Sequence, residues 1–236
     1  MGVSDVFLSI KNLSKSFTIY QANKQIKAIN SLSLHMNKGE FVGITGKSGS
    51  GKSTVLKCIY RTNLVDGGNI LYDSEAFGMI DLAKASEREI IYLRRYEFGY
   101  ISQFLHALPR TTAKQIVAAS AKDRYESKDE QLKAAEAMLK HFEIDEELWD
   151  VYPNTFSGGE KLRLNIAAAM VKHPRFLLLD EPTASLDNES KKKVRDLIEQ
   201  LKAEGTTMLG IFHDLEFMEG LCDREFNMQA GGFVGE

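Results

Sequence analysis

Hydrophobic residues recur along this chain with two periods, and these periods predict alternating strands and helices. A strand is predicted where apolar and polar residues alternate, or where a short apolar run stands between turn residues. The segments that fit are Val6–Ile10, Ala28–Met36, Phe41–Thr45, Ile70–Tyr72, Phe98–Phe104, Phe176–Leu179 and Thr206–Phe212. Some of these runs are almost entirely apolar, which is typical of strands buried inside an α/β sheet.

Helices are predicted where apolar residues recur three or four positions apart. Two such segments are Thr54–Tyr60 and Asn188–Glu204, and Gly205 is placed to end the second of them. Two more helices are predicted by capping boxes, in which a hydroxyl residue is followed three positions later by glutamate or glutamine. These boxes are Thr112–Gln115 and Ser127–Glu130.

The order of these elements predicts a single domain over residues 1–236. Residues from about 86 to 165 are predicted to form a mostly helical subdomain, inserted into a framework of about residues 1–85 and 166–236 that holds most of the strands. No internal repeat, low-complexity segment or long linker interrupts the pattern. We therefore expect one compact unit.

Composition excludes several classes of protein. The 236 residues carry a formal net charge of −3, which gives no general attraction to nucleic acid, so no direct nucleic-acid partner is expected. Cys58 and Cys222 lie far apart in apolar surroundings, which favours reduced structural thiols over a disulfide framework or a metal site. No apolar run approaches the ~20 residues of a membrane-spanning helix, and no signal peptide is evident, so a soluble cytoplasmic protein is expected.

The stretch from Gly46 to Ser53 fits the phosphate-loop pattern G-x-x-x-x-G-K-[ST]. Its glycines let the backbone wrap so that several N–H groups point at phosphate oxygens, and the following helix presents its positive N-terminus. Lys52 is predicted to reach the β- and γ-phosphates of a nucleotide triphosphate, and the Ser53 hydroxyl to ligate Mg²⁺. The nucleotide-binding residues predicted in this stretch are Gly46, Ser48, Gly49, Ser50, Gly51, Lys52, Ser53 and Thr54.

Polar residues also follow two of the predicted buried strands. Asp180 and Glu181 come directly after Phe176–Leu179, and His213 comes directly after Phe212. Because the carboxyl ends of strands border the ligand crevice of an α/β sheet, we expect Asp180 to hold Mg²⁺ through water and Glu181 to orient an attacking water. The matching position of His213 favours a catalytic role over a structural one.

Two further segments carry weaker signals. Ser157 can cap a helix while Gly158 and Gly159 leave its first amides open, which predicts a second anion site, although a plain capped turn has the same pattern. Phe17 and Tyr20 are aromatic residues on which an adenine ring can stack. An aromatic residue in an antiparallel strand is more often part of the core, so that alternative stays open.

Taken together, these segments resemble the ATP-binding cassette (ABC) ATPase family, from Phe17 to about Asp223. The motifs occur in the order in which the family has them. They are the A-loop aromatic Phe17, the phosphate loop, the Q-loop glutamine Gln103, the signature Phe156–Glu160, the Walker B segment Leu177–Asp180, the catalytic glutamate Glu181, the D-loop Ser185–Asp187 and the switch histidine His213. The resemblance implies a P-loop NTPase fold of ABC type: a RecA-like α/β core sheet, an antiparallel β subdomain and an inserted α-helical subdomain.

The resemblance also implies how the residues divide the work. The catalytic residues would be Glu181, His213, Lys52 and Gln103, and the Mg²⁺ ligands Ser53, Gln103 and Asp180. In this family the signature of one chain closes over the phosphate loop of another, in a homodimer or in a heterodimer with another ABC ATPase. The residues that would contact ATP held by the second chain are Ser157, Gly158, Gly159 and Asp187.

The chain departs from the family pattern at two positions. Glu160 stands where the signature usually has glutamine, a change that many members tolerate. Ala168 stands where the family often has arginine, which puts a structural ion pair in doubt and leaves the chemistry intact.

A narrower likeness concerns the partner. Five segments look like the L subunit of the carbon-phosphorus lyase system for phosphonate breakdown, namely Ile101–Leu105, Ala107–Arg110, Glu147–Trp149, Thr155–Glu160 and Gly210–Asp214. The ABC-type proteins of that system associate with a soluble lyase core, which this likeness implies as the partner. Two alternatives stay open: the cassette of a membrane transporter with separate spanning chains, and a docking module in which ATP turnover is incidental. Leu105–Arg110 is a hypothetical docking segment.

Overall fold

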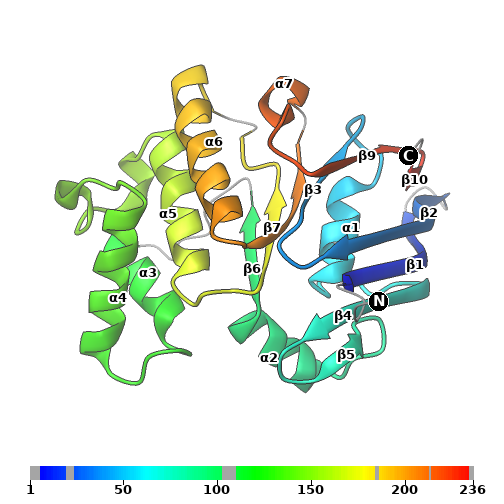
Figure 1. Ribbon diagram of the computed structural model, residues 1–236, viewed down its shortest axis with the longest axis horizontal. Helices are drawn as coiled ribbons and strands as arrows, with labels where there is room; N and C mark the ends of the chain where they lie inside the picture. The colour runs from blue at the N-terminus through cyan, green and yellow to red at the C-terminus, as the bar shows by residue number, and fades with distance from the viewer. Residues whose placement is uncertain (1–5, 20–23, 103–109, 184–185, 213, 234–236) are drawn as a thin grey trace.

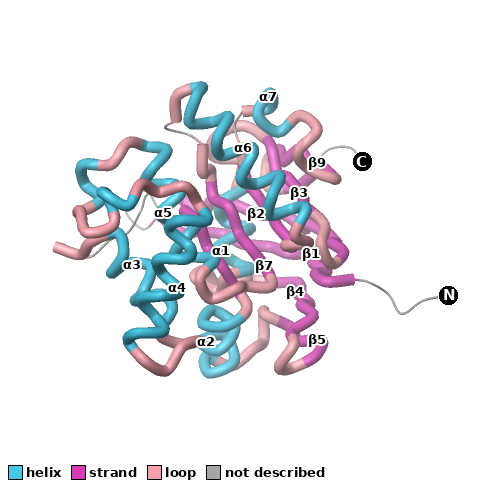
Figure 2. The backbone as a smooth tube through the Cα atoms, turned by 60° about the vertical axis from the view of Figure 1, so that its left-hand side comes forward, coloured by secondary structure: helices cyan, strands magenta, loops and turns pink. Residues whose placement is uncertain are grey.

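Two β-sheets and a group of helices make up the fold. The computed structural model describes residues 6–19, 24–102, 110–183, 186–212 and 214–233 of the chain, without the side chains of Lys24 and Leu215. Figure 1 shows the helices α3, α4 and α5 on one side of the molecule and the strands β1, β2, β4 and β5 on the other, with strands β6, β7 and β3 between them. Figure 2, turned by 60°, shows the same division, with α3, α4 and α5 on one side and β1, β4 and β5 at the opposite edge.

The smaller sheet is antiparallel and has the strand order β2-β1-β4-β5. Its strands are β1 (Val6–Ile19), β2 (Lys24–Asn37), β4 (Gly67–Ser74) and β5 (Gly78–Asp81). Alternate residues of β1 and β2 are buried at the ends next to the core, as the sequence pattern predicts for a sheet with one face covered. Both strands extend further than their apolar alternation, and β1 includes Phe17.

The larger sheet has the order β10-β9-β3-β8-β7-β6, and its strands from β9 to β6 are parallel. They are β3 (Phe41–Thr45), β6 (Phe98–Ser102), β7 (Phe176–Asp180), β8 (Thr207–Ile211) and β9 (Arg224–Gln229), followed by the short antiparallel β10 (Gly232–Phe233). Every residue of β3 and β8 is buried, which explains why these strands are continuous apolar runs.

The helices begin where their capping residues predict. The predicted boxes at Thr112 and Ser127 form, Ser157 caps its helix as predicted, in a box with Glu160, and a further box forms at Ser86 with Glu89. The helices are α1 (Lys52–Ile59), α2 (Glu87–Tyr96), α3 (Ala113–Ala121), α4 (Lys128–His141), α5 (Gly158–Met170), α6 (Asn188–Ala203) and α7 (Leu215–Met218), with 3₁₀ turns at Glu146–Leu148 and Pro153–Thr155.

The boundary placed at about residue 86 needs a correction. Strand β6 lies within the range 86–165, yet it pairs with β7 along its whole length, with Phe98 opposite Phe176 and Ser102 opposite Asp180. It therefore belongs to the larger sheet. Of the residues that the structure describes, the helical group begins after β6, at α3, and α2 precedes the edge strand of the sheet.

A buried carboxylate joins the two sheets. Glu97, between α2 and β6, is 3% exposed and accepts hydrogen bonds from Tyr72 Oη at 2.7 Å and Ser74 Oγ at 2.7 Å. Arg175 lies 3.6 Å from the same carboxylate. Because each buried oxygen of Glu97 has a partner, the carboxyl group is tolerated in this position.

Candidate functional site

The phosphate loop connects β3 to α1 and has room for glycine alone at two positions. The backbone of Gly46 has φ +134° and that of Gly51 φ +104°. A Cβ atom at Gly46 would lie 2.2 Å from the carbonyl oxygen of Met228, and one at Gly51 would lie 2.1 Å from that of Ala28. Both neighbours are backbone atoms that cannot rotate away. The loop is therefore held between β9 and β2, and its curvature depends on these glycines.

The start of α1 is open to an anion. Its first residue is preceded by Gly51, which provides no side-chain cap, and the first turn contains no acidic residue. The Ser50 hydroxyl is buried and has no hydrogen-bond partner among the described residues. A buried polar group without a partner is costly, and phosphate oxygens would accept its hydrogen bond. The loop therefore fits the phosphates that its sequence predicts. The predicted residues Ser48, Gly49 and Thr54 lie in the same loop and helix start.

Lys52 is the buried cation of this loop. Lys52 is 4% exposed, and its Nζ donates to the carbonyl oxygens of Gly46 at 2.7 Å and Lys47 at 3.0 Å. Burial lowers the pKa of the Lys52 amine, and the carboxylates of Glu181 and Asp180 oppose that shift. The amine is thus held by neutral carbonyl groups at the place where the sequence predicts phosphate.

Asp180, at the end of β7, receives hydrogen bonds on both of its oxygens. Ser53 Oγ donates to Oδ1 at 2.8 Å, and Tyr100 Oη donates to Oδ2 at 2.7 Å. The bond from Ser53 brings together the two Mg²⁺ ligands that the sequence predicts on different elements. A hydroxyl and a carboxylate side by side supply the hard oxygen ligands that Mg²⁺ prefers, so these residues fit the ion.

Tyr100 is a site residue that the sequence analysis missed. Its strand was predicted, but a tyrosine within an apolar strand is expected to pack in the core. The ring of Tyr100 lies 4.9 Å from that of Tyr60, and burial raises the pKa of the Tyr100 hydroxyl, so it stays a donor to Asp180. The parallel pairing of β6 with β7, which places Tyr100 beside the end of β7, is a long-range fact that no local pattern contains.

Glu181 follows β7 in an unusual backbone conformation. Its φ is +54°, and its backbone N–H donates to the carbonyl oxygen of Ile211 at the end of β8, at 3.1 Å. A left-handed conformation is rare for a non-glycine residue and often marks a functional position. Glu181 and Asp180 both line a cavity with Ser53.

Phe17 lies on β1 outside the core. It is 39% exposed, and Lys15 Nζ lies 5.3 Å from its ring centre. Phe17 pairs with Ile26 on β2, two residues before Ala28, whose carbonyl oxygen faces Gly51. An exposed ring in this position is available for stacking, in contrast to the core alternative left open above.

The signature residues Ser157, Gly158 and Gly159 form the start of α5. The capping box of Ser157 and Glu160 is closed, with Ser157 N–H donating to Glu160 Oε2 at 2.7 Å. Ser157 and Gly158 are exposed, whereas Gly159 is buried against Ser190. No described hydrogen bond or ion pair joins these residues to the phosphate loop of the same chain.

Asp187 of the D-loop lies next to this start of α5. Its Oδ1 accepts a hydrogen bond from the backbone N–H of Ser190 at 2.8 Å, which caps α6, and hydrogen bonds from Ser190 lower the pKa of its carboxyl. Ser190 thus contacts both Gly159 and Asp187, so the signature and the D-loop occupy one surface.

Several predicted residues lie outside the described part of the chain. They are Tyr20, Gln103, residues 105–109 of the docking segment, Ser185 and His213.

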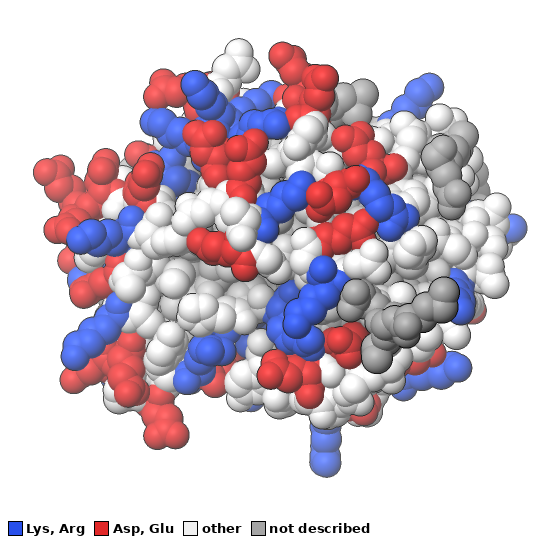
Figure 3. All heavy atoms as spheres, viewed as in Figure 1, with Lys and Arg blue, Asp and Glu red and all other residues white. Residues whose placement is uncertain are grey.

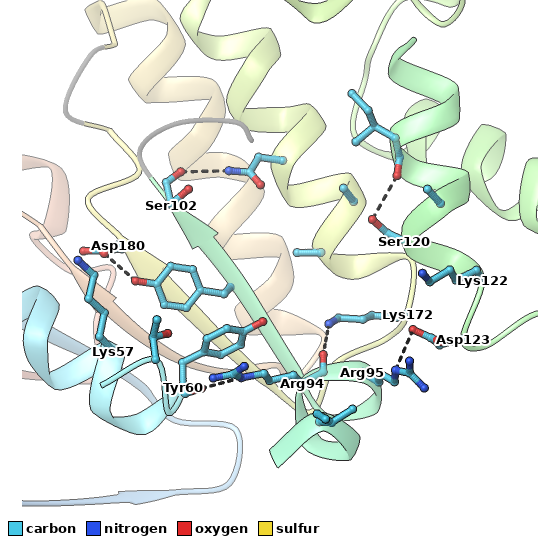
Figure 4. A pocket seen from close by; sticks show the side chains of 18 of the residues that line it. Lys57, Tyr60, Arg94, Arg95, Ser102, Ser120, Lys122, Asp123, Lys172 and Asp180 are labelled. Atoms are coloured by element: carbon cyan, nitrogen blue, oxygen red, sulfur yellow. Dashed lines mark hydrogen bonds and ion pairs between the residues drawn. The ribbon is translucent and has the colours of Figure 1, made fainter. Parts of the chain in front are cut away.

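A cavity of about 960 Å³ extends from the Asp180 site toward the helices. Ser53, Asp180 and Glu181 line one part of it, and residues of α1, α2, β6, α3 and α5 and of the turns that follow these helices line the rest. Figure 4 shows the Asp180 carboxylate with its tyrosine donor at one end and Arg94, Lys172, Arg95 and Asp123 at the other. A large hollow that borders the predicted hydrolysis residues is the expected form of a ligand site.

Known proteins with similar sequences and structures agree with this geometry. A family model described as ABC transporter matches residues 29–184. The chain is 35% identical to the lipoprotein-releasing system ATP-binding protein LolD of Buchnera aphidicola subsp. Schizaphis graminum, over 92% of this chain and 91% of that protein. It is 32% identical to the methionine import ATP-binding protein MetN of Haemophilus influenzae, over 97% of this chain and 66% of that protein.

A solved structure has the same fold. The dimeric ATP-binding cassette MJ0796, in a post-hydrolysis state bound to ADP and Pi, superposes with a TM-score of 0.87 and 29% sequence identity, and the match covers 97% of each chain. Within the described ranges of our chain, no helix is long and apolar enough to cross a membrane. The matched family model, the relatives and the shared fold together show that this chain belongs to the ABC transporter family and is an ABC-type ATPase.

Proposed function

We propose that this chain is the ATP-hydrolysing subunit of a membrane transporter whose spanning subunits are separate chains. The observation that carries the proposal is its identity of 35% along 91% of LolD, which is named as the ATP-binding protein of a lipoprotein-releasing system. The similar MetN is named as an ATP-binding protein of methionine import. Both names assign an ATP-binding protein to the release or import of a molecule, and this supports the transporter over the lyase partner predicted first.

In the proposed reaction, ATP and water give ADP and phosphate at the phosphate loop. The open amides of this loop and the Ser50 hydroxyl bind phosphate oxygens, and the Lys52 amine exchanges its two backbone carbonyl partners for a phosphate. Ser53 and Asp180, with Gln103, would hold Mg²⁺, and the ion would supply positive charge next to the phosphates. Tyr100 keeps the Asp180 carboxylate turned toward Ser53.

Glu181 accepts a proton from the attacking water in this proposal, and His213 helps to hold the reacting groups in line. The left-handed backbone of Glu181, fixed by its bond to Ile211, sets the direction of its side chain at the edge of the cavity. Phe17 stacks on the adenine ring. Substitution of Glu181, His213 or Phe17 by a residue that lacks the named group tests its role in ATP binding or hydrolysis.

The site becomes complete in a dimer. Ser157, Gly158 and Asp187 are exposed, and no described hydrogen bond or ion pair connects them to their own phosphate loop. We propose that Ser157, Gly158 and Gly159 of one chain bind the ATP held by a second chain, as a homodimer or with another ABC ATPase. Loss of the phosphate that bridges the two chains then lets the dimer open.

The dimer is tested with Glu181→Gln, which keeps the size of the side chain and removes its basicity. With excess MgATP this variant is expected to elute as a stable dimer in size-exclusion chromatography, because the bridging nucleotide is not hydrolysed. Lys52→Ala in the same background is the control, since without the Lys52 amine nucleotide binding and dimerisation are both expected to be lost. A Glu181→Gln protein that stays monomeric with MgATP bound would contradict the dimer.

The partner is tested by purifying the tagged chain from cells under mild detergent and identifying the bound proteins by mass spectrometry. Recovery with integral membrane proteins supports the transporter. Phosphate release, measured with and without the recovered partner, then distinguishes a driving ATPase from a docking module, because a docking module shows no stimulation by the partner.

A soluble carbon-phosphorus lyase core is the second candidate partner. It is supported by the five sequence segments noted above, of which Glu147–Trp149 lies in the helical group and Gly210–Ile211 ends β8. Recovery of the chain in the soluble fraction with enzymes of phosphonate breakdown, and without membrane proteins, would favour this partner over the transporter.

A further inference from the structure

Four basic side chains and one acidic one line the part of the cavity away from Asp180, which we call the outer cleft. Its residues are Arg94, Arg95, Lys122, Asp123 and Lys172. They come from three elements that end at the same place: α2 carries both arginines, α3 leads into Lys122 and Asp123, and α5 leads into Lys172. In Figure 4 the Arg94 guanidinium lies beside Tyr60, and the other four residues lie farther from Asp180. The formal charge of the outer cleft is therefore strongly positive, although the chain as a whole carries −3.

Few of these charges are neutralised by neighbouring side chains. Arg95 Nε lies 3.7 Å from Asp123 Oδ2, and this is the ion pair of the outer cleft. In the part of the chain that the structure describes, Arg94, Lys122 and Lys172 form no ion pair. Arg94 instead donates to the carbonyl oxygen of Tyr60 and stacks over its ring, and Lys172 Nζ donates to the carbonyl oxygen of Arg94 at 2.6 Å.

Helix ends offset only part of this charge. The C-terminus of a helix is equivalent to roughly half a negative charge, so the ends of α2, α3 and α5 supply about 1.5 negative charges. Three basic side chains without an ion pair exceed that amount. Like charges that face a cavity repel one another, and this repulsion is relieved when an anion enters.

The burial of Lys172 adds to this argument. Burial lowers the pKa of its amine to about 8, with Asp123 opposing the shift. Its hydrogen-bond acceptor is a neutral carbonyl, as it is for Lys52 in the phosphate loop. Lys122, by contrast, is exposed and has no described hydrogen bond or ion pair, so its amine is available to a ligand.

We propose that the outer cleft is a further anion site, separate from the phosphate loop and from the signature, which binds a small molecule bearing a phosphate-type oxyanion. Several donors around one hollow suit the three oxygens of such a group. The cavity also contains Ser53, Asp180 and Glu181, so two sources can supply the anion: the phosphate released by hydrolysis, or a phosphate-type anion from solution. The proposal does not depend on the identity of the partner chain.

The test measures binding of inorganic phosphate by calorimetry, in protein whose phosphate loop is filled with a non-hydrolysable ATP analogue and Mg²⁺. The Lys122→Met variant is expected to bind phosphate about 2- to 5-fold more weakly, as for an exposed charge pair. Lys172→Met is expected to bind it about 10-fold more weakly, as for a hydrogen bond to a charged group. Lys192→Met, on the exposed face of α6, is the matched control and is expected to bind phosphate like the wild type.

A second measurement distinguishes the sources. Release of phosphate after a single turnover is followed with a phosphate sensor and compared with the rate of hydrolysis. If the outer cleft receives the product, Lys122→Met changes the interval between hydrolysis and release. If the anion comes from solution only, that interval is unchanged while the titrations still differ.

Two results would overturn the proposal. One is equal phosphate binding by the wild type, Lys122→Met and Lys172→Met when the phosphate loop is filled. The other is an effect of Lys122→Met that is seen only on assembly with a partner chain, which would assign the basic groups to an acidic protein segment instead. Because Lys122 has no described bond, its substitution is not expected to affect folding, and thermal unfolding of the variant checks this.

Discussion

The phosphate loop contains a buried lysine and the outer cleft a half-buried one, and each amine donates to backbone carbonyl groups. Lys52 bonds to Gly46 and Lys47, and Lys172 bonds to Arg94. Burial is the main cause that lowers the pKa of both amines. The regions differ in what surrounds the amine: two carboxylates act on Lys52, whereas the one carboxylate acting on Lys172 already pairs with Arg95.

This difference explains why one lysine is recognisable in the sequence and the other is not. Lys52 belongs to a loop that is built from eight consecutive residues with required glycines, so its role can be read locally. Lys172 gains its surroundings from three helix ends that are distant in the sequence. A similar chemical arrangement therefore arises once from a motif and once from the tertiary fold.

The largest effect is expected on nucleotide binding, when each of the two lysines is replaced by methionine in a separate variant. Lys52→Met should weaken binding of a fluorescent ATP analogue on the order of 100-fold, because two hydrogen bonds to charged oxygens are lost. Lys172→Met should change that binding less than about 2-fold, since it lies outside the proposed ATP contacts. Equilibrium titration measures both, and equal losses in the two variants would show that the outer cleft is part of the ATP site.

The next largest effect is on stability, and it compares two glycines of the phosphate loop that differ in the space around a Cβ atom. Gly51→Ala forces a methyl group against the Ala28 carbonyl at a positive φ, whereas Gly49 has φ +78° with nothing within 4 Å of its Cβ position. Gly49→Ala should cost about 1–2 kcal/mol of backbone strain, and Gly51→Ala should cost more, because a clash is added to that strain. Urea unfolding gives the two free energies. Equal costs would contradict the close approach of β2 to the loop.

Much of the fold follows from local patterns. The fully buried β3 and β8 are apolar runs, the helix starts at Thr112 and Ser127 have the predicted capping boxes, and Ser157 caps α5 as predicted. These features depend on neighbouring residues, which a sequence displays directly. Assignment of β6 to the larger sheet depends on its pairing with β7, about 80 residues away in the chain, as in the contact of Tyr100 with Asp180.

The site was predicted in the same uneven way. The sequence identified Ser53 and Asp180, and the structure brings their oxygens to 2.8 Å. It did not identify Tyr100, because a tyrosine in a strand has no pattern that separates a hydroxyl bonded to a carboxylate from one in the core. The outer cleft was missed for a related reason: basic residues near helix ends are common, and only their convergence is unusual.

Tyr100→Phe is expected to have a smaller effect, on the Mg²⁺ requirement of the ATPase. Tyr100 lies in the cavity that connects the Asp180 site to the outer cleft. The substitution keeps the ring and removes one of the two hydroxyls that orient Asp180, so the carboxylate should turn away from Ser53 more often. We expect the Mg²⁺ concentration for half-maximal ATPase activity to rise about 3- to 10-fold, the effect of one hydrogen bond to a charged group. Binding of the ATP analogue without Mg²⁺ should not change.

Tyr60→Phe is the matched control for this variant. The ring of Tyr60 packs against Tyr100, but no described hydrogen bond uses its hydroxyl. A Mg²⁺ requirement that shifts equally in both variants would assign the effect to ring packing and remove Tyr100 from the group that positions Asp180.

The smallest effect is expected in the dependence of stability on pH. Folding lowers the pKa of the Lys172 amine from the ordinary 10.5 to about 8, so between these values the unfolded chain binds more protons than the folded chain. The contribution of Lys172 to stability therefore rises as pH increases from about 8 to 10.5, and below 8 its buried charge is a constant cost. Lys172→Met removes this cost and also the bond to Arg94, so the shape of the pH dependence is more informative than its absolute value.

We expect the unfolding free energies of Lys172→Met and of the wild type to converge or cross as the pH rises from 7 to 10, by about 1 kcal/mol after screening by solvent. Urea unfolding at several pH values measures this, with Lys192→Met as the exposed control. Other charges that face the amine, those of Arg94, Arg95, Lys122 and Asp123, are present in both proteins.

Parallel curves of unfolding free energy against pH would mean that the Lys172 amine is not desolvated. Convergence that disappears when phosphate is added would instead connect the buried cation to the anion site, because a bound anion raises the pKa of the amine toward its ordinary value.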